Sequence, residues 1–229
     1  MEEKVGKFSS SKISNLIPLA KKKDSIFSNS GLTYIRSIVI ENIKKKSKPE
    51  IDALPLIWGK SIEQFCFEQL GLEYVLESKK VIHHPTIKKW CGTPDGFKKD
   101  VVYDIKCPWT LESFFDLILC DTIEKLKEEY PEYYWQLVSN ACLGNTDKAE
   151  LIIFCPKEKQ LSELMDYLPE NSKLLFYEDS FPLLPDDIKN LFIFDYIIPE
   201  SDKIFLEKRI KEAIKELFKQ LEKYEKILK

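Results

Sequence analysis

The chain has 229 residues, of which 44% are hydrophobic and 32% charged, and its formal net charge is −3. This composition excludes a wholly disordered or collagen-like chain, and no apolar run reaches the ~18–20 residues that a membrane helix needs. The amino terminus lacks the apolar core of a secretory signal. We therefore expect one globular domain in the cytoplasm.

Helices are predicted at the start of the chain. Ser9, Ser10 and Ser11 are typical helix N-cap residues and precede an apolar-periodic stretch at 13–17. A second helix is predicted over 32–46, with lysines at its C-terminal end. A third is predicted over 55–70, where Gly71 ends it.

The hydrophobic period then changes to that of strands. Three short strands are predicted at 73–83, 91–97 and 101–107, with turns at Pro85 and at 98–100. This change of period indicates a small sheet in the middle of the chain.

The second half of the chain alternates helix and strand. Pro131 suits the first turn of a helix, and the apolar run AELIIFC is typical of a strand buried on both faces. The pattern over 157–190 leaves helix, strand and loop open. The predicted elements are helices at 110–129 and 131–143, strands at 149–155 and 191–198, and an amphipathic helix from about 202 to the C-terminus. The order predicts a single mixed α/β domain over 1–229, with a basic helical part at 1–48, a core at 55–156 and a C-terminal helix at 200–229.

The charge is unevenly distributed. Residues 1–48 carry 11 Lys and Arg against 4 Asp and Glu, and the remainder carries 24 against 34. The basic residues include Lys21, Lys22 and Lys23, and the run 44–48. Charge alone leaves two interpretations open, solvated helix ends or a surface that faces a polyanion.

The six cysteines form no CxxC pair and no cluster with zinc-finger spacing. We expect them to be reduced and mostly buried. This pattern disfavours a zinc or iron–sulfur site.

The segment GTPDGFKKDVVYDIKCP contains two acids and a lysine that are candidate catalytic residues. Asp95 lies in a Pro-Asp-Gly turn, and Asp104 and Lys106 lie two apart on the following strand. Side chains alternate along a strand, so Asp104 and Lys106 project together while Ile105 points into the core. A short hairpin would bring Asp95 beside Asp104.

Each piece alone is common, because Pro-Asp-Gly is an ordinary turn and Asp-x-Lys an ordinary exposed strand pattern. Together, two carboxylates repel each other unless a cation joins them. Hard oxygen ligands suit Mg²⁺ or Mn²⁺, and Lys106 could orient a water or neutralise charge on a phosphate. The segment therefore favours metal-assisted hydrolysis of a phosphodiester.

Asp95, Asp104 and Lys106 match the PD-(D/E)xK nuclease motif, and the chain resembles the lambda-exonuclease-like (YqaJ-type) viral recombinase family. WGKSIEQF, with Glu63, resembles the acidic helix of that family, and IKCPW resembles its Lys-Cys-Pro. YYWQLVSNACLG, with Gln136, resembles its Gln-bearing helix, and KVGKFSSSKISNLI resembles its N-terminal phosphate-binding segment. These stretches span residues 4–156.

The resemblance implies roles for individual residues. Glu63, Asp95, Asp104, Lys106 and Gln136 would be catalytic. The metal ligands would be Asp95, Asp104, the Ile105 main-chain carbonyl and Glu63, around one or two Mg²⁺ or Mn²⁺ ions. Lys4, Ser11, Thr93 and Gln136 would bind a 5′-phosphate of DNA. For Arg36 the sequence itself leaves two interpretations open, a contact with phosphate or a cap of the 32–46 helix.

The chain departs from the family at two of these positions. Lys4 stands where the family usually has Arg, and an ammonium cannot make a bidentate fork to phosphate. A strict requirement for a 5′-phosphate is therefore not implied. Asp104 stands where the family often has Glu, a change that bears on metal preference.

The resemblance also implies a PD-(D/E)xK core, with a mixed central sheet flanked by helices. The expected activity is that of a metal-dependent DNA exonuclease, 5′→3′ on linear double-stranded DNA, which leaves 3′ single strands for phage-type recombination. The expected partners are double-stranded DNA ends, a single-strand annealing protein and further copies of the chain, in a trimer, in a bacterial host of a phage or prophage. Two alternatives stay open, an endonuclease or nickase on the same core and a DNA-binding module with a decayed site.

Overall fold

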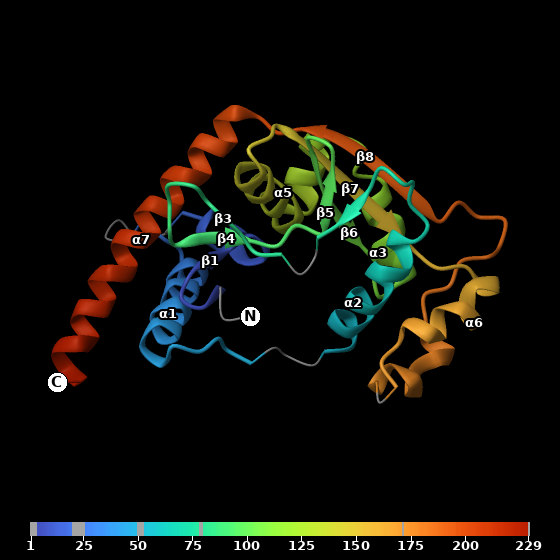
Figure 1. Cartoon of the computed structure of the whole chain (residues 1–229), viewed down its shortest axis with the longest axis horizontal. Helices are drawn as coiled ribbons and strands as arrows, with labels where there is room; N and C mark the ends of the chain where they lie inside the picture. The colour runs from blue at the N-terminus through green and yellow to red at the C-terminus, as the bar shows by residue number, and fades with distance from the viewer. Residues whose placement is uncertain (1–3, 20–25, 50–52, 78–79, 171, 229) are drawn as a thin grey trace.

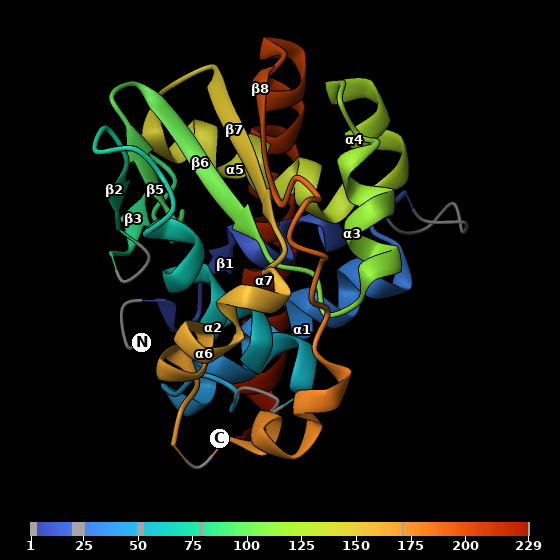
Figure 2. The same ribbon diagram turned by 90° about the vertical axis from the view of Figure 1, so that its right-hand side faces the viewer.

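The computed structural model describes residues 4–19, 26–49, 53–77, 80–170 and 172–228. A five-stranded sheet lies at its centre, in the order β2-β5-β6-β7-β8. Its strands are β2 (Val75–Leu76), β5 (Gly96–Lys98), β6 (Val101–Lys106), β7 (Lys148–Phe154) and β8 (Leu191–Ile197). Within this sheet β6 and β7 pair in parallel, side by side in Figure 2, and the other pairs are antiparallel.

A smaller sheet lies beside the first and contains the N-terminal segment. Its order is β1-β4-β3, with β1 parallel and β3 antiparallel to β4. Its strands are β1 (Phe8–Ser9), β3 (Ile82–His83) and β4 (Trp90–Gly92). The chain passes from this sheet into the central one between β4 and β5.

Helices cover the sheets, and the longest, α7, runs along one side of the molecule (Figure 1). The α-helices are α1 (Asn29–Lys44), α2 (Leu54–Phe67), α3 (Leu111–Ile118), α4 (Ile123–Glu129), α5 (Pro131–Gly144), α6 (Leu161–Leu164) and α7 (Glu200–Leu228). The 3₁₀ helices are η2 (Ser10–Leu16), η3 (Glu158–Gln160), η4 (Met165–Tyr167) and η5 (Lys173–Ser180). The hydroxyl oxygens of Ser28, Thr110 and Thr122 accept hydrogen bonds from backbone N–H groups at the starts of α1, α3 and α4.

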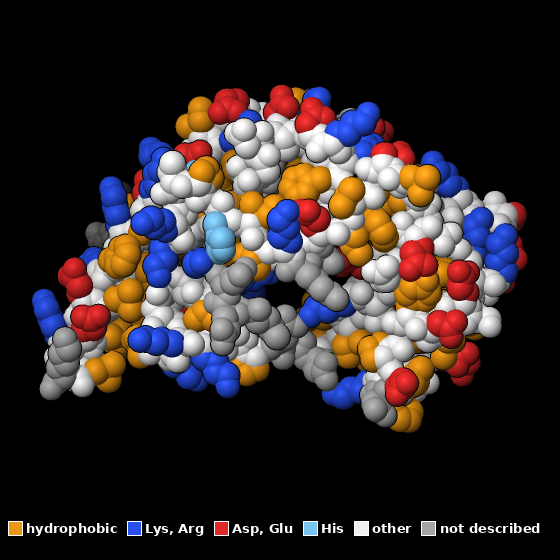
Figure 3. All heavy atoms as spheres, in the orientation of Figure 1, with side chains coloured by type: hydrophobic (Ala, Val, Ile, Leu, Met, Phe, Trp, Pro, Cys, Tyr) orange, Lys and Arg blue, Asp and Glu red, His pale blue; other side chains and the backbone are white. Residues whose placement is uncertain are grey.

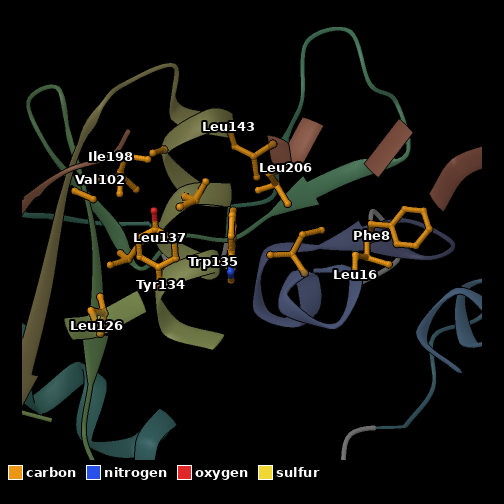
Figure 4. Close-up of a cluster of buried hydrophobic side chains, with 14 of the residues drawn as sticks. Phe8, Leu16, Val102, Leu126, Tyr134, Trp135, Leu137, Leu143, Ile198 and Leu206 are labelled. Carbon is orange, nitrogen blue, oxygen red and sulfur yellow. The ribbon is translucent and has the colours of Figure 1, made fainter. Parts of the chain in front are cut away.

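The two faces of the central sheet bury different side chains. On one face, Val102 packs with Leu137 of α5 in a cluster that extends to Leu16 of η2 (Figure 4). On the other, Tyr103 and Ile105 pack with residues of α2 in a second cluster. Since side chains of β6 alternate between these faces, Asp104 and Lys106 lie on the α5 side. Because α5 packs on one face of the sheet and α2 on the other, the side chains of Asp104 and Lys106 point towards α5.

Most predicted elements are confirmed. The helices over 32–46, 55–70 and 131–143 correspond to α1, α2 and α5, and the long C-terminal helix corresponds to α7. The strands over 149–155 and 191–198 are β7 and β8, and all of β7 after its first residue is buried. No helix of the described residues is long and apolar enough to cross a membrane.

Three local predictions were wrong. The stretch 73–83 forms two short strands in different sheets, and 91–97 is interrupted between β4 and β5, where Pro94 has no N–H for a sheet bond. The predicted helix over 110–129 is two helices, because Thr122 caps a new one. The helix predicted after the serines is confirmed as the 3₁₀ helix η2, although its N-cap, Ser9, makes no side-chain cap bond. In the described part of 157–190 the structure is short helices and loop.

Candidate active site

The β5–β6 hairpin brings Asp95 beside the Asp104 strand, as predicted. Gly96 of β5 pairs with Tyr103 of β6, so Asp95 stands next to Asp104 across the hairpin. The main-chain N–H of Ile105 donates to Oδ2 of Asp95 over 2.6 Å. A side chain at Gly96 would collide with the Val75 carbonyl and the Tyr103 hydroxyl. The Pro-Asp-Gly turn therefore needs glycine here because of the close approach of its neighbours.

Asp104, Lys106 and Gln136 contact one another on the α5 side of the sheet. Lys106 Nζ forms an ion pair with Asp104. Gln136 Nε2 donates to Asp104 Oδ1 over 2.7 Å, and Lys106 Nζ lies 3.4 Å from Gln136 Oε1. Asp104 is fully buried, whereas Lys106 and Gln136 are half-buried. The triangle links the strand motif to the helix that bears Gln136.

The carboxylates of the site repel one another. Burial, and then the charges of Asp104 and Glu63, raise the pKa of Asp95 well above its ordinary value. Burial lowers the pKa of Lys106, but the charges of Asp104 and Asp95 outweigh it and leave that pKa raised. The lysine therefore stays an ammonium. Three acids with one ammonium make a site whose negative charge exceeds its positive charge.

Glu63 approaches from α2, on the other side of the sheet. It is half-buried, and its charge raises the pKa of Asp95 and, as a lesser cause, that of Cys107. Among the described residues, no three His, Cys, Asp or Glu side chains are grouped so as to hold a metal ion. The hairpin places the carboxylates of Asp95 and Asp104 side by side, and the Ile105 carbonyl, expected as a further metal ligand, belongs to the residue between Asp104 and Lys106 on β6.

An aromatic side chain that the motif did not single out completes this site. The ring centroid of Tyr133 lies 4.9 Å from Lys106 Nζ. Tyr133 and its neighbours Tyr134 and Trp135 are aromatic side chains on a helix, which either pack in the core or stack on bases. Tyr134 and Trp135 are core residues, at 1% and 5% exposure, whereas Tyr133 is half-buried beside Lys106.

A second group of predicted residues gathers at the N-terminal segment. Lys4 Nζ donates to Thr93 Oγ1 over 2.8 Å. Lys4 and the exposed Ser11 both line a cavity of about 200 Å³ against α1. Other lysines line the same cavity and were not predicted as site residues, namely Lys7, Lys12 and Lys48. In Figure 3, Lys and Arg side chains gather on the left, around α1, and Asp and Glu are frequent on the right, around α6.

Buried hydrogen bonds connect the N-terminal segment beside this cavity to α5, the helix that bears Gln136. Ser139 Oγ of α5 lies 2.8 Å from Ser10 Oγ and accepts from Trp90 Nε1 over 2.9 Å. Ser139 is three residues from Gln136, and Ser10 adjoins Ser11. Thr93 is two residues before Asp95. Two separate links therefore connect the cavity with the Asp104 site, one through Ser10 and Ser139 and the other along residues 93–95.

Other residues singled out from the sequence lie elsewhere. Arg36 is exposed on α1, and Lys21, Lys22 and Lys23 lie outside the described residues. His83 is exposed, while His84 is buried and stacks on Trp90. All six cysteines are free thiols, and five of them are buried, as expected.

No protein-family model matches the sequence, and no curated protein sequence matches it. Solved structures do match. An alkaline exonuclease from Laribacter hongkongensis superposes with a TM-score of 0.69 at 16% identity, over 98% of this chain and 94% of that chain. The complex of that exonuclease with dAMP gives a TM-score of 0.70 at 16% identity, over 99% and 95%. A phage-related exonuclease from Haemophilus somnus 129PT gives 0.67 at 14% identity, over 97% and 96%.

At these identities the likeness establishes a shared fold. It covers nearly the whole of each chain, so the N-terminal segment and α7 belong to that fold as well as the central sheet. The mixed α/β nuclease fold expected from the resemblance to the lambda-exonuclease-like family is confirmed.

Proposed function

We propose that this chain is a divalent-metal-dependent DNA exonuclease that degrades linear duplexes from their 5′ ends and leaves 3′ single strands. The observation that carries the proposal is the contact network of Asp104, Lys106 and Gln136, with Asp95 held beside it. It occurs in a fold shared with two proteins described as exonucleases. The complex of one of them with dAMP supports a nucleotide-binding role for this fold.

The donor set suits a hard divalent cation. Asp95 and Asp104, with the Ile105 carbonyl, offer oxygen ligands of the kind that Mg²⁺ and Mn²⁺ prefer. Burial, and then the charges of Asp104 and Glu63, raise the pKa of Asp95, and a cation bound beside Asp95 would favour its charged form. One or two such ions would polarise the scissile phosphate and lower the pKa of a water molecule. Glu63 contributes its charge from the α2 side.

The chain's own residues position the substrate. Lys106, held as an ammonium, orients the water and neutralises charge that develops on the phosphate. Gln136 reaches the phosphate from α5, where its amide already bridges Asp104 and Lys106. The low solvent exposure of this site strengthens each electrostatic contact.

The cavity lined by Lys4 and Ser11 is proposed to receive the terminal 5′-phosphate, with Thr93 at its border. The additional lysines supply positive charge, and phosphate contacts of this kind provide affinity without sequence preference. Because Lys4 offers a point charge rather than a guanidinium fork, a 5′-phosphate is preferred rather than required. Arg36 is a further candidate for contacts to the DNA backbone.

Three parts of the proposal rest on the family resemblance. They are assembly into a homo-oligomer, with a ring-shaped trimer as the expected form, cooperation with a single-strand annealing protein, and a phage or prophage origin. A ring would make the enzyme processive by enclosing its DNA.

The test is digestion of a linear duplex labelled at either the 5′ or the 3′ end, with and without Mg²⁺. A covalently closed circle and single-stranded DNA accompany it. The expected result is Mg²⁺-dependent loss of the 5′ label with the circle intact. Asp104→Asn should abolish cleavage and keep DNA binding. Asp195→Asn, the same change at an exposed site on β8, should cleave like the wild type.

Other outcomes favour the alternatives. Opening of the closed circle would support an endonuclease or nickase on the same core. Binding without cleavage under both Mg²⁺ and Mn²⁺ would support a DNA-binding module with a decayed site.

A further inference from the structure

Among the described residues, three side chains that differ in kind contact the Lys106 ammonium, and the charge of Asp95 acts on it as well. Asp104 gives it a full negative charge, Gln136 an amide oxygen at 3.4 Å, and Tyr133 the face of an aromatic ring at 4.9 Å. An ammonium within about 6 Å of an aromatic centroid is attracted by the negative face of the ring. Tyr133 is therefore a third side chain that attracts the Lys106 ammonium, and it does so through an uncharged aromatic ring.

The ring of Tyr133 is itself held in place. Tyr130 stacks on it with parallel planes and ring centroids 5.6 Å apart. Tyr133 and Gln136 are three residues apart on α5, so they project from the same side of the helix. Ser139 of that helix is hydrogen-bonded to Ser10 of the N-terminal segment and to Trp90 of β4. The ring thus has a defined place beside Lys106, although it is only half-buried.

The charge of Asp104 serves two purposes in the proposed enzyme. It pairs with Lys106 in this structure, and it is also a proposed ligand for the divalent cation. A cation held by Asp104 would share this carboxylate, and the attraction of Asp104 for the Lys106 ammonium would then be weaker. Tyr133 has no charge and does not compete for the cation, so its attraction to Lys106 persists.

We propose that Tyr133 is a positioning residue that keeps the Lys106 ammonium beside Asp104 and Gln136 during hydrolysis, with Tyr130 supporting its ring. This inference rests on the proposed function, since Lys106 acts there on the water and the phosphate. The role of Tyr133 depends on the π electrons of its ring and not on its hydroxyl group.

The test uses single-turnover cleavage of pre-bound 5′-labelled duplex, started with Mg²⁺. Tyr133→Phe should cleave at the wild-type rate, and Tyr133→Leu should be slower by between about two-fold and about thirty-fold, with DNA affinity unchanged. The matched control is Tyr224→Leu on α7, which should cleave like the wild type. Thermal unfolding of each variant shows whether it is folded.

A graded series separates electrostatics from packing. Replacing Tyr133 by Phe and then by mono-, di- and trifluorophenylalanine withdraws electrons from the ring while changing its shape little. The rate should fall stepwise along the series. Equal rates across it, or an equal loss in Tyr133→Phe and Tyr133→Leu, would overturn the proposal. The series also decides the case if Tyr133→Leu does not fold.

A readout independent of cleavage distinguishes this inference from the proposed function. In lysine-labelled protein, the ε-methylene signals of Lys106, identified by their loss in Lys106→Ala, should be shifted by the ring current of Tyr133. Tyr133→Leu should remove that shift and Tyr133→Phe should keep it. A wild type that shows the shift but does not cleave would refute the nuclease and leave the placement of Lys106 intact. An unshifted Lys106 in a protein that cleaves would refute the role of Tyr133 alone.

Discussion

The N–H of Ile105 donates to Oδ2 of Asp95 over 2.6 Å, so the residue between Asp104 and Lys106 holds the first acid of the motif in place. The side chain of Ile105 faces α2 while its neighbours face α5. One strand therefore presents two candidate catalytic side chains on one face and holds a third through its backbone. This arrangement fixes the acids close together in spite of their repulsion.

Asp95→Asn is expected to remove activity and increase stability. The amide oxygen of Asn can still accept from Ile105, but the charge that Asp104 and Glu63 oppose is gone. Cleavage should fall by about a hundred-fold or more, the loss typical of removing one electrostatic partner of a reaction. The midpoint of thermal unfolding in EDTA should rise, because the variant lacks a buried charge that Asp104 and Glu63 repel. Functional sites are often less stable than the fold allows.

The same pair of proteins tests metal binding. Mg²⁺ should raise the unfolding midpoint of the wild type and leave that of Asp95→Asn unchanged. A variant that is less stable than the wild type in EDTA would contradict the repulsion between the acids.

Lys4→Met is expected to reduce the preference for 5′-phosphorylated over 5′-hydroxyl DNA ends. Lys4 lines the cavity and reaches Thr93. Loss of one hydrogen bond to a charged group should lower the preference by about ten-fold or more. Competition between the two kinds of end in one digestion measures it directly.

The control for this substitution is Lys219→Met, at a lysine whose side chain is 81% exposed on α7. It should leave the preference unchanged. Equal losses on both kinds of end in Lys4→Met would refute the assignment of the cavity to a terminal phosphate.

Lys98 and Glu150 form an ion pair in which the carboxylate is buried and the ammonium is partly exposed. The loss of stability should therefore differ between removal of Lys98 and removal of Glu150. Glu150 is fully buried and pairs with Lys98, and its other oxygen accepts from Tyr74 over 2.8 Å. Lys98→Ala leaves that carboxylate without its cation and should cost about 3–5 kcal/mol of unfolding free energy. Glu150→Ala should cost less, because the Lys98 side chain is 25% exposed and its ammonium can reach water.

Urea unfolding of the two variants measures this difference. Asp100→Ala, which breaks an exposed pair with Lys148, is the control and should change stability little. A larger cost for Glu150→Ala than for Lys98→Ala would contradict the explanation.

Stability should also fall in mild acid because of His84. Burial, opposed by the charge of Glu207, lowers the pKa of this histidine, and its Nδ1 accepts from the N–H of Ile87 over 3.0 Å. A pKa below that of the unfolded state means that the unfolded chain takes up the proton more readily. The contribution to stability is therefore present above the ordinary pKa of about 6.5 and is lost as pH falls below it.

His84→Asn keeps an acceptor for Ile87 and cannot be protonated. The unfolding midpoint should fall less for this variant than for the wild type between about pH 7.5 and about pH 5.5. His83→Asn, the same change at the exposed neighbour, should fall like the wild type. A fall in His84→Asn as large as that of the wild type would show that other groups cause the acid sensitivity.

The local sequence determined the parts of this protein that depend on short-range physics. The period of two in DVVYDIK placed Asp104 and Lys106 on one face of β6, and the Pro-Asp-Gly turn brought Asp95 beside them. Helical periodicity and Pro131 located α5 and therefore Gln136. These features follow from backbone geometry within a few residues, so no distant partner was needed to predict them.

Tertiary structure alone decided which separate segments meet. Lys7 and Lys12 belong to the segment that resembles a phosphate-binding one, but only the fold shows that both line a cavity against α1, in a segment that Ser10 joins to Ser139 of α5. Tyr133 has the same periodicity as a core residue, and only its packing against β6 places it beside Lys106. Such contacts depend on side chains far apart in the chain, whose approach the local pattern does not encode. The local sequence therefore determined the placement of the candidate catalytic side chains on β6, and the packing of α5 against the sheet and the N-terminal segment decided what surrounds them.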